Sequence, residues 1–293
     1  MRRRVFLASA GIAALAGCSS GTGSNDGTAT PTSASTQTQT GDPNFEIRGT
    51  RFPGSKTLNV ATTFVIAIEN TGTGAGTFTS ELDMRVGDGQ WETAGEIEMD
   101  IPAGETAEWH SPEFLPQYLT TLHFRLSEFD QTWSIEITPR ELDFGNYYAV
   151  PNGLYINVLG GAFESAYPTS DESTNSTATA TATATATPTP TATPTQAPDG
   201  ETWAVISLDV RNRLQEPLTA PPASSFDLKV GGESRPQHQE VAENPYEGGE
   251  LAGRTVRRGE LVYAVPEGTQ VRDLSVVWDK SFPEGDVKCT WTK

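Results

Sequence analysis

The sequence predicts an all-β protein with two β-sandwich domains and disordered Thr/Ala/Pro-rich segments. Apolar and polar residues alternate with the period of two that strands have, and no helical period competes with it. Short groups of Gly, Pro, Asn and Asp, which turns prefer, separate the alternating runs. About seven short strands in about 95 residues is the strand count of a β-sandwich.

The first predicted sandwich covers residues 44–139. Each run places apolar side chains on one face, so Leu82, Met84 and Val86 are expected to face the core together. The run Gly72–Gly76 leads into another strand rather than a helix, so we expect a flexible connection and no phosphate-binding loop. The predicted strands lie within Val60–Ile68, Leu82–Val86, Ile97–Ile101, Leu122–Leu126 and Trp133–Ile137.

The second predicted sandwich covers residues 140–293 and follows a break at Pro139–Gly145. Its first strand is Leu154–Leu159, and its second, Thr202–Val210, ends in Arg211-Asn212 much as an earlier strand ends in Glu69-Asn70. Later alternating runs lie at Phe226–Val230, Leu261–Val265 and Leu274–Trp278.

A tract of alternating Thr-Ala and Thr-Pro at residues 168–200 has two interpretations. As an interdomain linker it separates domains at 44–167 and 200–293. As an insertion in the first loop of the second domain, it keeps Leu154–Leu159 with its own sandwich, where the strand would otherwise be an orphan. We favour the insertion, because doubling the length of a loop costs only about 0.6 kcal/mol.

Two short motifs in the first domain carry a resemblance. They are Asn70-Thr71-Gly72-Thr73-Gly74 and, about thirty residues later, Pro102-Ala103-Gly104-Glu105-Thr106. The region of about residues 45–138 resembles the cell-adhesion-related Ig-like domains of bacteria and archaea. This resemblance implies an Ig-like fold and an extracellular setting, and it implies no ligand.

The second domain also resembles a known domain. Gly248-Gly249-Glu250-Leu251 and Leu261–Pro266 resemble an Ig-like domain of unknown function found in prokaryotic lipoproteins, over about residues 141–293. Arg254-Thr255 departs from the usual turn of that family. The resemblance implies a second Ig-like β-sandwich.

The first eighteen residues predict export and lipid anchoring. Arg3 and Arg4, followed by Val-Phe-Leu, resemble the twin-arginine export signal, and Leu15-Ala16-Gly17-Cys18 resembles a lipobox. The apolar run between them has 13 residues, from Val5 to Gly17, and is too short to span a bilayer of roughly 30 Å. Cys18 is therefore expected to begin the mature chain and to tether it through a lipid to the extracellular face of the cytoplasmic membrane.

Two segments are expected to be disordered. Residues 19–43 are rich in Ser, Thr, Gly and Gln and predict a stalk, because they cannot bury enough apolar surface to fold. The tract at 168–200 has the composition of O-glycosylated stalks, and Asn175 within it begins an Asn-Ser-Thr acceptor for N-glycosylation.

The chain is strongly acidic, with a net charge of −18, and loss of the signal arginines leaves 17 basic against 38 acidic residues. The excess of acid and the presence of only five lysines resemble proteins of salt-in halophilic archaea. A solvated acidic surface explains this composition better than a surface for cations or basic partners. Nucleic-acid binding is disfavoured, because no basic stripe is present.

The sequence contains no recognisable catalytic, cofactor or metal constellation. His110, His123 and His238 have no ligand neighbours at suitable spacing, and Asp83 and Asp88 lack the spacing of a calcium loop. With Cys18 lipidated, Cys289 has no disulfide partner and is expected to be a half-buried strand residue without nucleophilic reactivity.

One loop is a candidate binding site. Asn244–Gly249 is polar and contains a single aromatic residue, Tyr246, of the kind that binding loops use. The alternative interpretation is a tyrosine packed into the core.

These observations predict a non-enzymatic, membrane-anchored extracellular lipoprotein that acts as a binding, adhesion or structural module. Its expected partner is an unidentified envelope protein or glycan. The alternative is an accessory or solute-binding subunit of a membrane transport or redox complex. A third interpretation is an enzyme with an unrecognised site.

Overall fold

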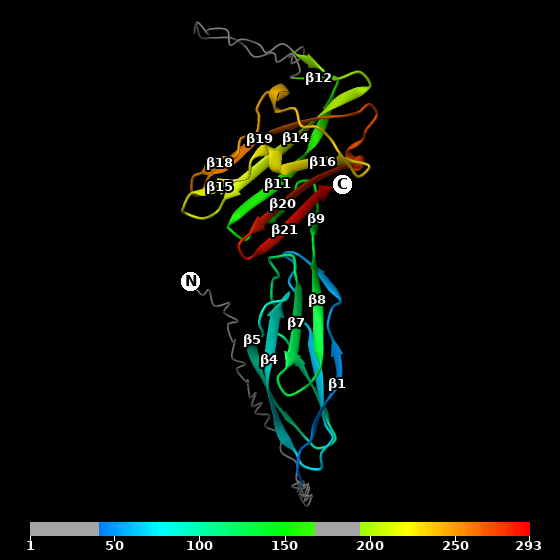
Figure 1. Cartoon of the computed structure of the whole chain (residues 1–293), viewed down its shortest axis with the longest axis vertical. Helices are drawn as coiled ribbons and strands as arrows, with labels where there is room; N and C mark the ends of the chain where they lie inside the picture. Colours follow the sequence, from blue (N-terminus) through cyan, green and yellow to red (C-terminus); the bar gives the residue numbers. More distant parts are fainter. Residues whose placement is uncertain (1–40, 168–193) are drawn as a thin grey trace, which may run out of the picture. The chain divides into compact units, whose positions relative to one another are not determined.

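The structure, a computed structural model, describes residues 41–167 and 194–293 (Figure 1). Those residues form twenty-one strands and three short 3₁₀ helices, which confirms the prediction of an all-β protein. Within them no helix has the length and hydropathy needed to cross a membrane. The predicted export residues Arg3, Arg4 and Cys18 and the glycosylation acceptor Asn175 lie outside the described residues.

Contacts divide the chain into two compact units, of which the first comprises the described residues 41–54, 62–114 and 121–135. A three-stranded antiparallel sheet has the order β1-β3-β6, and β4 pairs antiparallel with both β5 and β7. The strands are β1 (Phe45–Arg51), β3 (Val65–Asn70), β4 (Gly76–Val86), β5 (Glu92–Ile101), β6 (Thr106–His110), β7 (Thr121–Leu126) and β8 (Thr132–Thr138), whose last three residues belong to the second unit.

The core of the first unit is an aromatic cluster. Phe52 stacks on Phe64, with 4.2 Å between ring centroids, and on Trp133, with 5.1 Å. Phe64, next to β3, also contacts Phe124 of β7 at 4.8 Å, so the cluster joins the two sheets. Aromatic pairs at these distances contribute about 0.5–1.5 kcal/mol each beyond the burial of their area.

Leu82, Met84 and Val86 of β4 lie on one face, as predicted, opposite Leu126, Phe124 and Leu122 of β7. The pairing of β4 with β5 shifts register between Leu82 and Asp83, which is the mark of a β-bulge. The extra residue of this bulge is Ala94 of β5, so the alternation of faces along β4 is unbroken. Val86, the last residue of the strand, is nonetheless 48% exposed, whereas Asp83 on the opposite face is only 8% exposed.

The glycine-rich run after β3 is closely packed, so the expectation of a flexible connection is wrong. A Cβ on Gly74 would lie 1.9 Å from the carbonyl oxygen of Gly41, and one on Gly72 would lie 2.3 Å from that of Asp42. Only glycine permits this close approach of two backbones.

Asn70, buried at the end of β3, holds the same region together. Its Oδ1 accepts hydrogen bonds from the backbone N–H of Asn44 and Gly72, at 3.1 and 3.0 Å. Its Nδ2 donates to the carbonyls of Gly74 and Ile101, at 2.8 and 2.9 Å.

The second unit comprises the described residues among 55–61, 115–120 and 136–293. Its two larger sheets have the orders β10-β11-β14-β19 and β17-β16-β20-β21-β9. The strands of these sheets are β9 (Arg140–Asp143), β10 (Tyr147–Ala149), β11 (Leu154–Glu164), β14 (Glu201–Asn212), β16 (Phe226–Val230), β17 (Glu233–Ser234), β19 (Val256–Pro266), β20 (Leu274–Phe282) and β21 (Gly285–Thr292).

Shorter elements complete the second unit. β2 (Ser55–Thr57) pairs in parallel with the end of β8, and two ribbons join β12 to β13 and β15 to β18. The remaining elements are β12 (Ala166–Tyr167), β13 (Thr195–Gln196), β15 (Leu218–Ala220), β18 (Gly249–Leu251) and the 3₁₀ helices η1 (Ala223–Ser225), η2 (Gln239–Val241) and η3 (Val271–Asp273).

The two larger sheets pack face to face around a buried core. The hydroxyl of Tyr263 on β19 donates to the carbonyl of Phe226 on β16 at 2.9 Å. Tyr148 of β10 contacts Trp278 of β20, with 6.1 Å between ring centroids. The apolar residues of β14 that face this core, Ala204, Ile206, Leu208 and Val210, are each at most 1% exposed.

The strands on either side of the Thr/Ala-rich tract are neighbours. β11 pairs antiparallel with β14 from Leu154 opposite Asn212 to Glu164 opposite Trp203. β12 and β13 continue this pairing, and since Thr195 and Gln196 of β13 lie within the tract 168–200, the prediction of disorder is wrong for its last residues. Both flanking segments therefore belong to the same side of the second unit.

Two local expectations for the second domain are wrong. The predicted break at Pro139–Gly145 contains β9, which pairs in parallel with β21 from Arg140 opposite Cys289 to Asp143 opposite Thr292. Cys289 itself is fully buried rather than half-buried, because its strand lies between β20 and β9 and its side chain points into the core.

Asn212, at the end of β14, binds backbone groups of neighbouring segments through its side-chain amide, as Asn70 does at the end of β3. Its Nδ2 donates to the carbonyls of Glu216, Leu251 and Ala252, at 2.7, 3.1 and 3.2 Å. Its Oδ1 accepts from the backbone N–H of Leu214 at 2.9 Å.

Asn212→Ala is expected to lower the free energy of unfolding by about 2–4 kcal/mol, since each buried group left unpaired costs about 1–3 kcal/mol. Urea denaturation measures this change at a constant m-value. Asn244→Ala is the matched control, because Asn244 is exposed and its side chain makes no hydrogen bond. Equal effects of the two substitutions would contradict the assigned role of Asn212.

Burial raises the pKa of the Cys289 thiol. The unfolded chain then loses this proton at a lower pH than the folded chain does, so stability is fully present below about pH 8.5 and falls above it. The expected slope approaches about 1.4 kcal/mol per pH unit. Urea denaturation at pH 7.5, 8.5 and 9.5 tests this, and Cys289→Ala should flatten the profile. An equally steep profile for the variant would refute the assignment.

Candidate functional site

The β10-β11-β14-β19 sheet has an inner face in the core and an outer face that is only partly covered. β14 alternates between them, so Trp203, Val205, Ser207, Asp209 and Arg211 lie on the outer face. The register places them in rows that cross the sheet. Asp209 lies opposite Arg258 of β19 and Asn157 of β11, and Ser207 lies opposite Glu260.

One end of the outer face is covered by a second, smaller hydrophobic cluster. Tyr167 of β12 and Val241 of η2 pack there against the outer side chains of β14 and β19. The indole of Trp203 donates to the carbonyl of Thr195 at 2.9 Å. The buried members of the cluster are Tyr167, Trp203, Val205, Val241, Val262 and Ala264.

The free edge of β19 is covered by the chain around η2. The side chain of Gln239 acts as a short piece of strand, because its Oε1 accepts from the N–H of Val262 at 3.2 Å and its Nε2 donates to the carbonyl of Glu260 at 3.1 Å. Backbone bonds from Glu260 to Asn244 and from His238 to Val262 complete the cover.

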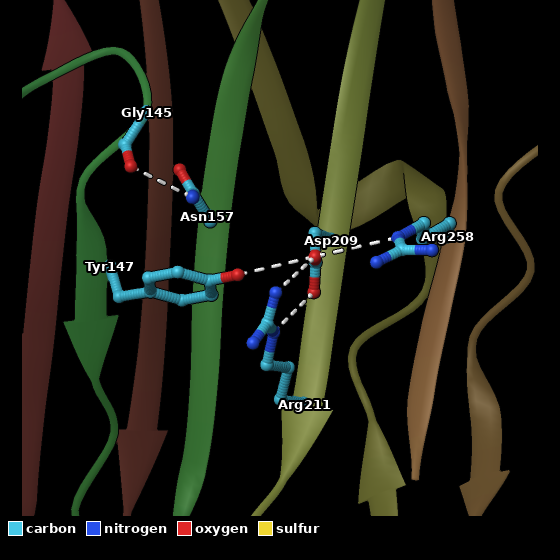
Figure 2. A network of polar contacts seen from close by, with 6 residues as sticks. All are labelled: Gly145, Tyr147, Asn157, Asp209, Arg211 and Arg258. Atoms are coloured by element: carbon cyan, nitrogen blue, oxygen red, sulfur yellow. Dashed lines mark hydrogen bonds and ion pairs between the residues drawn. The ribbon is translucent and has the colours of Figure 1, made fainter.

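Beyond the covered end, the outer face carries a polar network in which Tyr147, Arg211 and Arg258 surround Asp209 (Figure 2). We call this network the Asp209 cluster. Asp209 is only 2% exposed. Arg211 donates to its two carboxylate oxygens, from Nε at 3.2 Å and from a terminal nitrogen at 3.1 Å. The hydroxyl of Tyr147 reaches across from β10 and donates to the same carboxylate at 3.2 Å. Nε of Arg258 lies 3.6 Å from it.

The buried carboxylate of Asp209 orients the arginines around it. The hydrogen bond from Arg211 raises the pKa of that guanidinium, which therefore stays charged. The guanidinium of Arg211 also stacks on the ring of Tyr147, with 4.7 Å to the ring centroid. Since both carboxylate oxygens already accept hydrogen bonds, Asp209 is suited to holding its neighbours in place rather than to moving a proton.

Next to the Asp209 cluster lies an open hollow of about 390 Å³. A register shift between Val158 and Gly160 forms its floor, where Gly160 has a φ of +115° and Gly160 and Gly161 add no side chains. Glu260 lies on its wall, and its Oε2 accepts from the Tyr167 hydroxyl at 2.8 Å and from the N–H of Asn244 at 3.2 Å. The other lining residues are Leu159, Ala162, Glu164, Tyr167, Val205 and Ser207.

The first unit has a similar cluster. Asp83, buried on the face of β4 opposite Leu82 and Met84, accepts from Nε of Arg125 at 3.1 Å. The guanidinium of Arg125 lies over Trp91, with 4.4 Å to the ring centroid, and that of Arg85 lies over the same ring at 4.9 Å. Both units thus combine a buried aspartate, a paired arginine and an aromatic ring.

The candidate binding residue Tyr246 is not on the surface. It is 2% exposed and packs edge-to-face against Phe226, with 6.0 Å between ring centroids. Its loop therefore presents no exposed aromatic ring, and the structure has the packed tyrosine of the alternative interpretation. Gly259 makes room for it, because a Cβ there would lie 2.4 Å from the Cα of Tyr246.

The histidines do not converge on a common site. His123 lies opposite Arg85 across β4 and β7, while His238 contacts Glu240 at 2.9 Å and the ring of Trp203. In the part of the chain that the structure describes, no group of three or more His, Cys, Asp or Glu side chains is placed to hold a metal ion.

The sequence reasoning missed the Asp209 cluster. The available signal was the pair of charged residues, Asp209 and Arg211, at alternate positions of a strand whose intervening residues are apolar. Their contact with Tyr147 and Arg258 depends on the order of four strands, which the alternation does not specify.

Comparisons with known proteins find a family of unknown function and distant folds. Residues 167–286 match a family described as a domain of unknown function (DUF4352). No curated protein matches the chain.

Three solved structures illustrate the distant matches. An uncharacterized β-sandwich protein from Clostridium difficile 630 is 14% identical, with 53% of this chain and 94% of that chain covered and a TM-score of 0.32. The yjhA protein from Bacillus subtilis is 14% identical, with coverage of 51% and 97% and a TM-score of 0.32. The secreted protein MPT63 from Mycobacterium tuberculosis is 12% identical, with coverage of 53% and 98% and a TM-score of 0.31.

Asp209→Asn is expected to destabilise the second unit by about 2 kcal/mol, because it removes the charge from hydrogen bonds that arginine makes to a buried carboxylate. Thermal unfolding followed by near-ultraviolet circular dichroism measures the loss. Asp279→Asn is the control, since Asp279 is an exposed residue of β20 outside the Asp209 cluster. If both variants unfold at the wild-type temperature, Asp209 does not stabilise the unit.

Proposed function

We propose that the protein is a membrane-anchored extracellular lipoprotein that acts as a non-enzymatic binding module. The observation that carries this proposal is the outer face of the β10-β11-β14-β19 sheet, where the Asp209 cluster adjoins an open hollow. Ordered polar groups beside a concave surface are the usual components of a ligand site.

The chemistry of the face supports binding rather than catalysis. The carboxylate of Asp209 is occupied by Arg211 and Tyr147, so it has no free position from which to act as a base. The thiol of Cys289 is buried, and burial raises its pKa, which removes the thiolate that a nucleophile needs.

The setting follows from the sequence. In this proposal Arg3 and Arg4 direct export, Cys18 carries the lipid and Asn175 carries a glycan. The stalk predicted at residues 19–43 ends before Gly41, because Gly41 and Asp42 pack against the run Gly72–Gly74. Residues 44–139 and 140–293 form two Ig-like sandwiches, and the tract at 168–200 is a loop insertion in the second. The pairing of β11 with β14 supports that last assignment. The acidic composition supports a high-salt environment.

The second candidate function is an accessory or solute-binding subunit of a transport or redox complex. The hollow favours it, because about 390 Å³ is within the range of sites for small ligands, roughly 300–1,000 Å³. Its open side distinguishes it from the enclosed sites in which small solutes are usually buried.

Cys18→Ser is expected to release the protein from the membrane, since no lipid can then be attached. Fractionation of cells, followed by detergent phase partitioning of the membrane fraction, measures the shift from the detergent phase to the soluble phase. Cys289→Ser is the matched control and should stay with the membrane. Retention of the Cys18→Ser protein in the detergent phase would contradict the lipid anchor.

Crosslinking on intact cells in molar salt separates the two candidate functions. Recovery of one envelope protein or glycan, lost in the Cys18→Ser strain, supports the binding module. Recovery of permease or redox subunits supports the second candidate. Accessibility of the wild-type protein to protease added outside the cells tests the extracellular location independently.

A further inference from the structure

The outer face of the second unit carries unneutralised positive charge in an acidic protein. Two rows of the sheet register contain eight outward residues, of which only Asp209 is acidic. The rows are Ala149, Tyr155, Arg211 and Val256, and then Tyr147, Asn157, Asp209 and Arg258. With Arg213 just past the end of β14, the three arginines against one aspartate give a net charge of +2 on this arginine face.

Two of these arginines have donors to spare. The side chain of Arg258 is 69% exposed and forms a long ion pair with Asp209 at 3.6 Å. Arg213 is exposed, and its guanidinium lies over the ring of Tyr155, with 4.1 Å to the centroid. The stacked ring and the buried carboxylate restrict these side chains, so ordering them on binding costs less entropy than for free arginines.

We infer that the arginine face, with Arg213 and Arg258 as its main contacts, binds the carboxylates of an acidic polysaccharide. The inference rests on the proposed function and names the ligand class of the same site. A guanidinium presents a planar fork of donors that matches a carboxylate.

The spacing favours a polymer over a single small anion. Arg211 and Arg213 are two positions apart along the chain, about 7 Å, and Arg258 is on the neighbouring strand at a similar diagonal distance. Arg213 and Arg258, on either side of Arg211, engage repeated carboxylates of one chain together, and linked contacts of this kind bind more tightly than separate ones. In the high salt of the proposed environment the Debye length is about 3 Å, so the distant acidic surface does not oppose these direct contacts.

The neighbouring hollow favours a sugar over an acidic peptide. Beside the arginine face it offers the hydroxyl of Ser207 and the carboxylate of Glu260. These groups suit neutral hydroxyls, whereas Glu260 would repel further carboxylates. The ligand that fits both areas carries carboxylates interspersed with hydroxyl groups.

The test is isothermal titration of the full-length protein in detergent with an oligogalacturonate. Binding to the wild type is expected, and Arg213→Gln with Arg258→Gln should raise Kd at least tenfold. Arg272→Gln, which replaces an arginine whose side chain is 70% exposed on η3, is the matched control and should leave Kd unchanged. Equal unfolding temperatures for all three proteins exclude a folding effect.

Titrations with related ligands test whether carboxylates and sugar hydroxyls are both recognised. The methyl-esterified oligogalacturonate, which lacks the negative charges, is expected not to bind. Equal binding of the ester, tighter binding of polyglutamate, an unchanged Kd in the double variant, or no binding of oligogalacturonate would each overturn the inference. Cell fractionation with Cys18→Ser and protease accessibility test the proposed function separately, so failure of one does not imply failure of the other.

Discussion

The order of both units depends on a buried asparagine at the end of a central strand. Asn70 and Asn212 each use both ends of their amide to bind backbone groups of segments that are distant in sequence, Ile101 for one and Leu251 for the other. An asparagine has two donors and one acceptor in a fixed plane, so it can satisfy several turns at once. Without it, those turns would bury unpaired carbonyls and N–H groups. The glycines beside Asn70 then allow the backbones to approach closely.

This constraint also explains where the outer face of the second unit ends. Asn212 fixes the end of β14 and the turn that follows, which determines where Arg211 and Arg213 leave the sheet. The buried Asp209 then orients the arginines from within the sheet. The positions of the arginines on this face therefore depend on the hydrogen-bonded backbone, whereas their side chains provide the groups that bind.

The alternation of apolar residues was sufficient to predict the all-β class and most strands, because it records which side of a strand is buried. The alternation was insufficient wherever the surroundings of a side chain depend on which strands pair. Asp83 is buried on the face of β4 opposite its apolar residues, where Arg125 pairs with it, a setting that the alternation does not record. β9 is short and polar and is held by parallel pairing with β21, a contact that no local pattern records. The Asp209 cluster was missed for the same reason, since Tyr147, Asp209 and Arg258 meet only through strand order. Tyr246 lies in a polar loop, which suggested exposure, yet its ring is buried in the core. The absence of a side chain at Gly259 leaves room for it.

The cover over β19 has a consequence for proteins held close together in two dimensions. An open strand of eleven residues at the edge of a sheet is a template on which a strand of a neighbouring molecule can assemble. The proposed anchoring to a membrane would raise the effective concentration of such neighbours far above that in solution. The Gln239 amide occupies backbone groups of β19 to which a strand of a neighbouring molecule would otherwise bind. The arginine face stays open. Dense lateral packing is then compatible with each molecule remaining a separate folded unit.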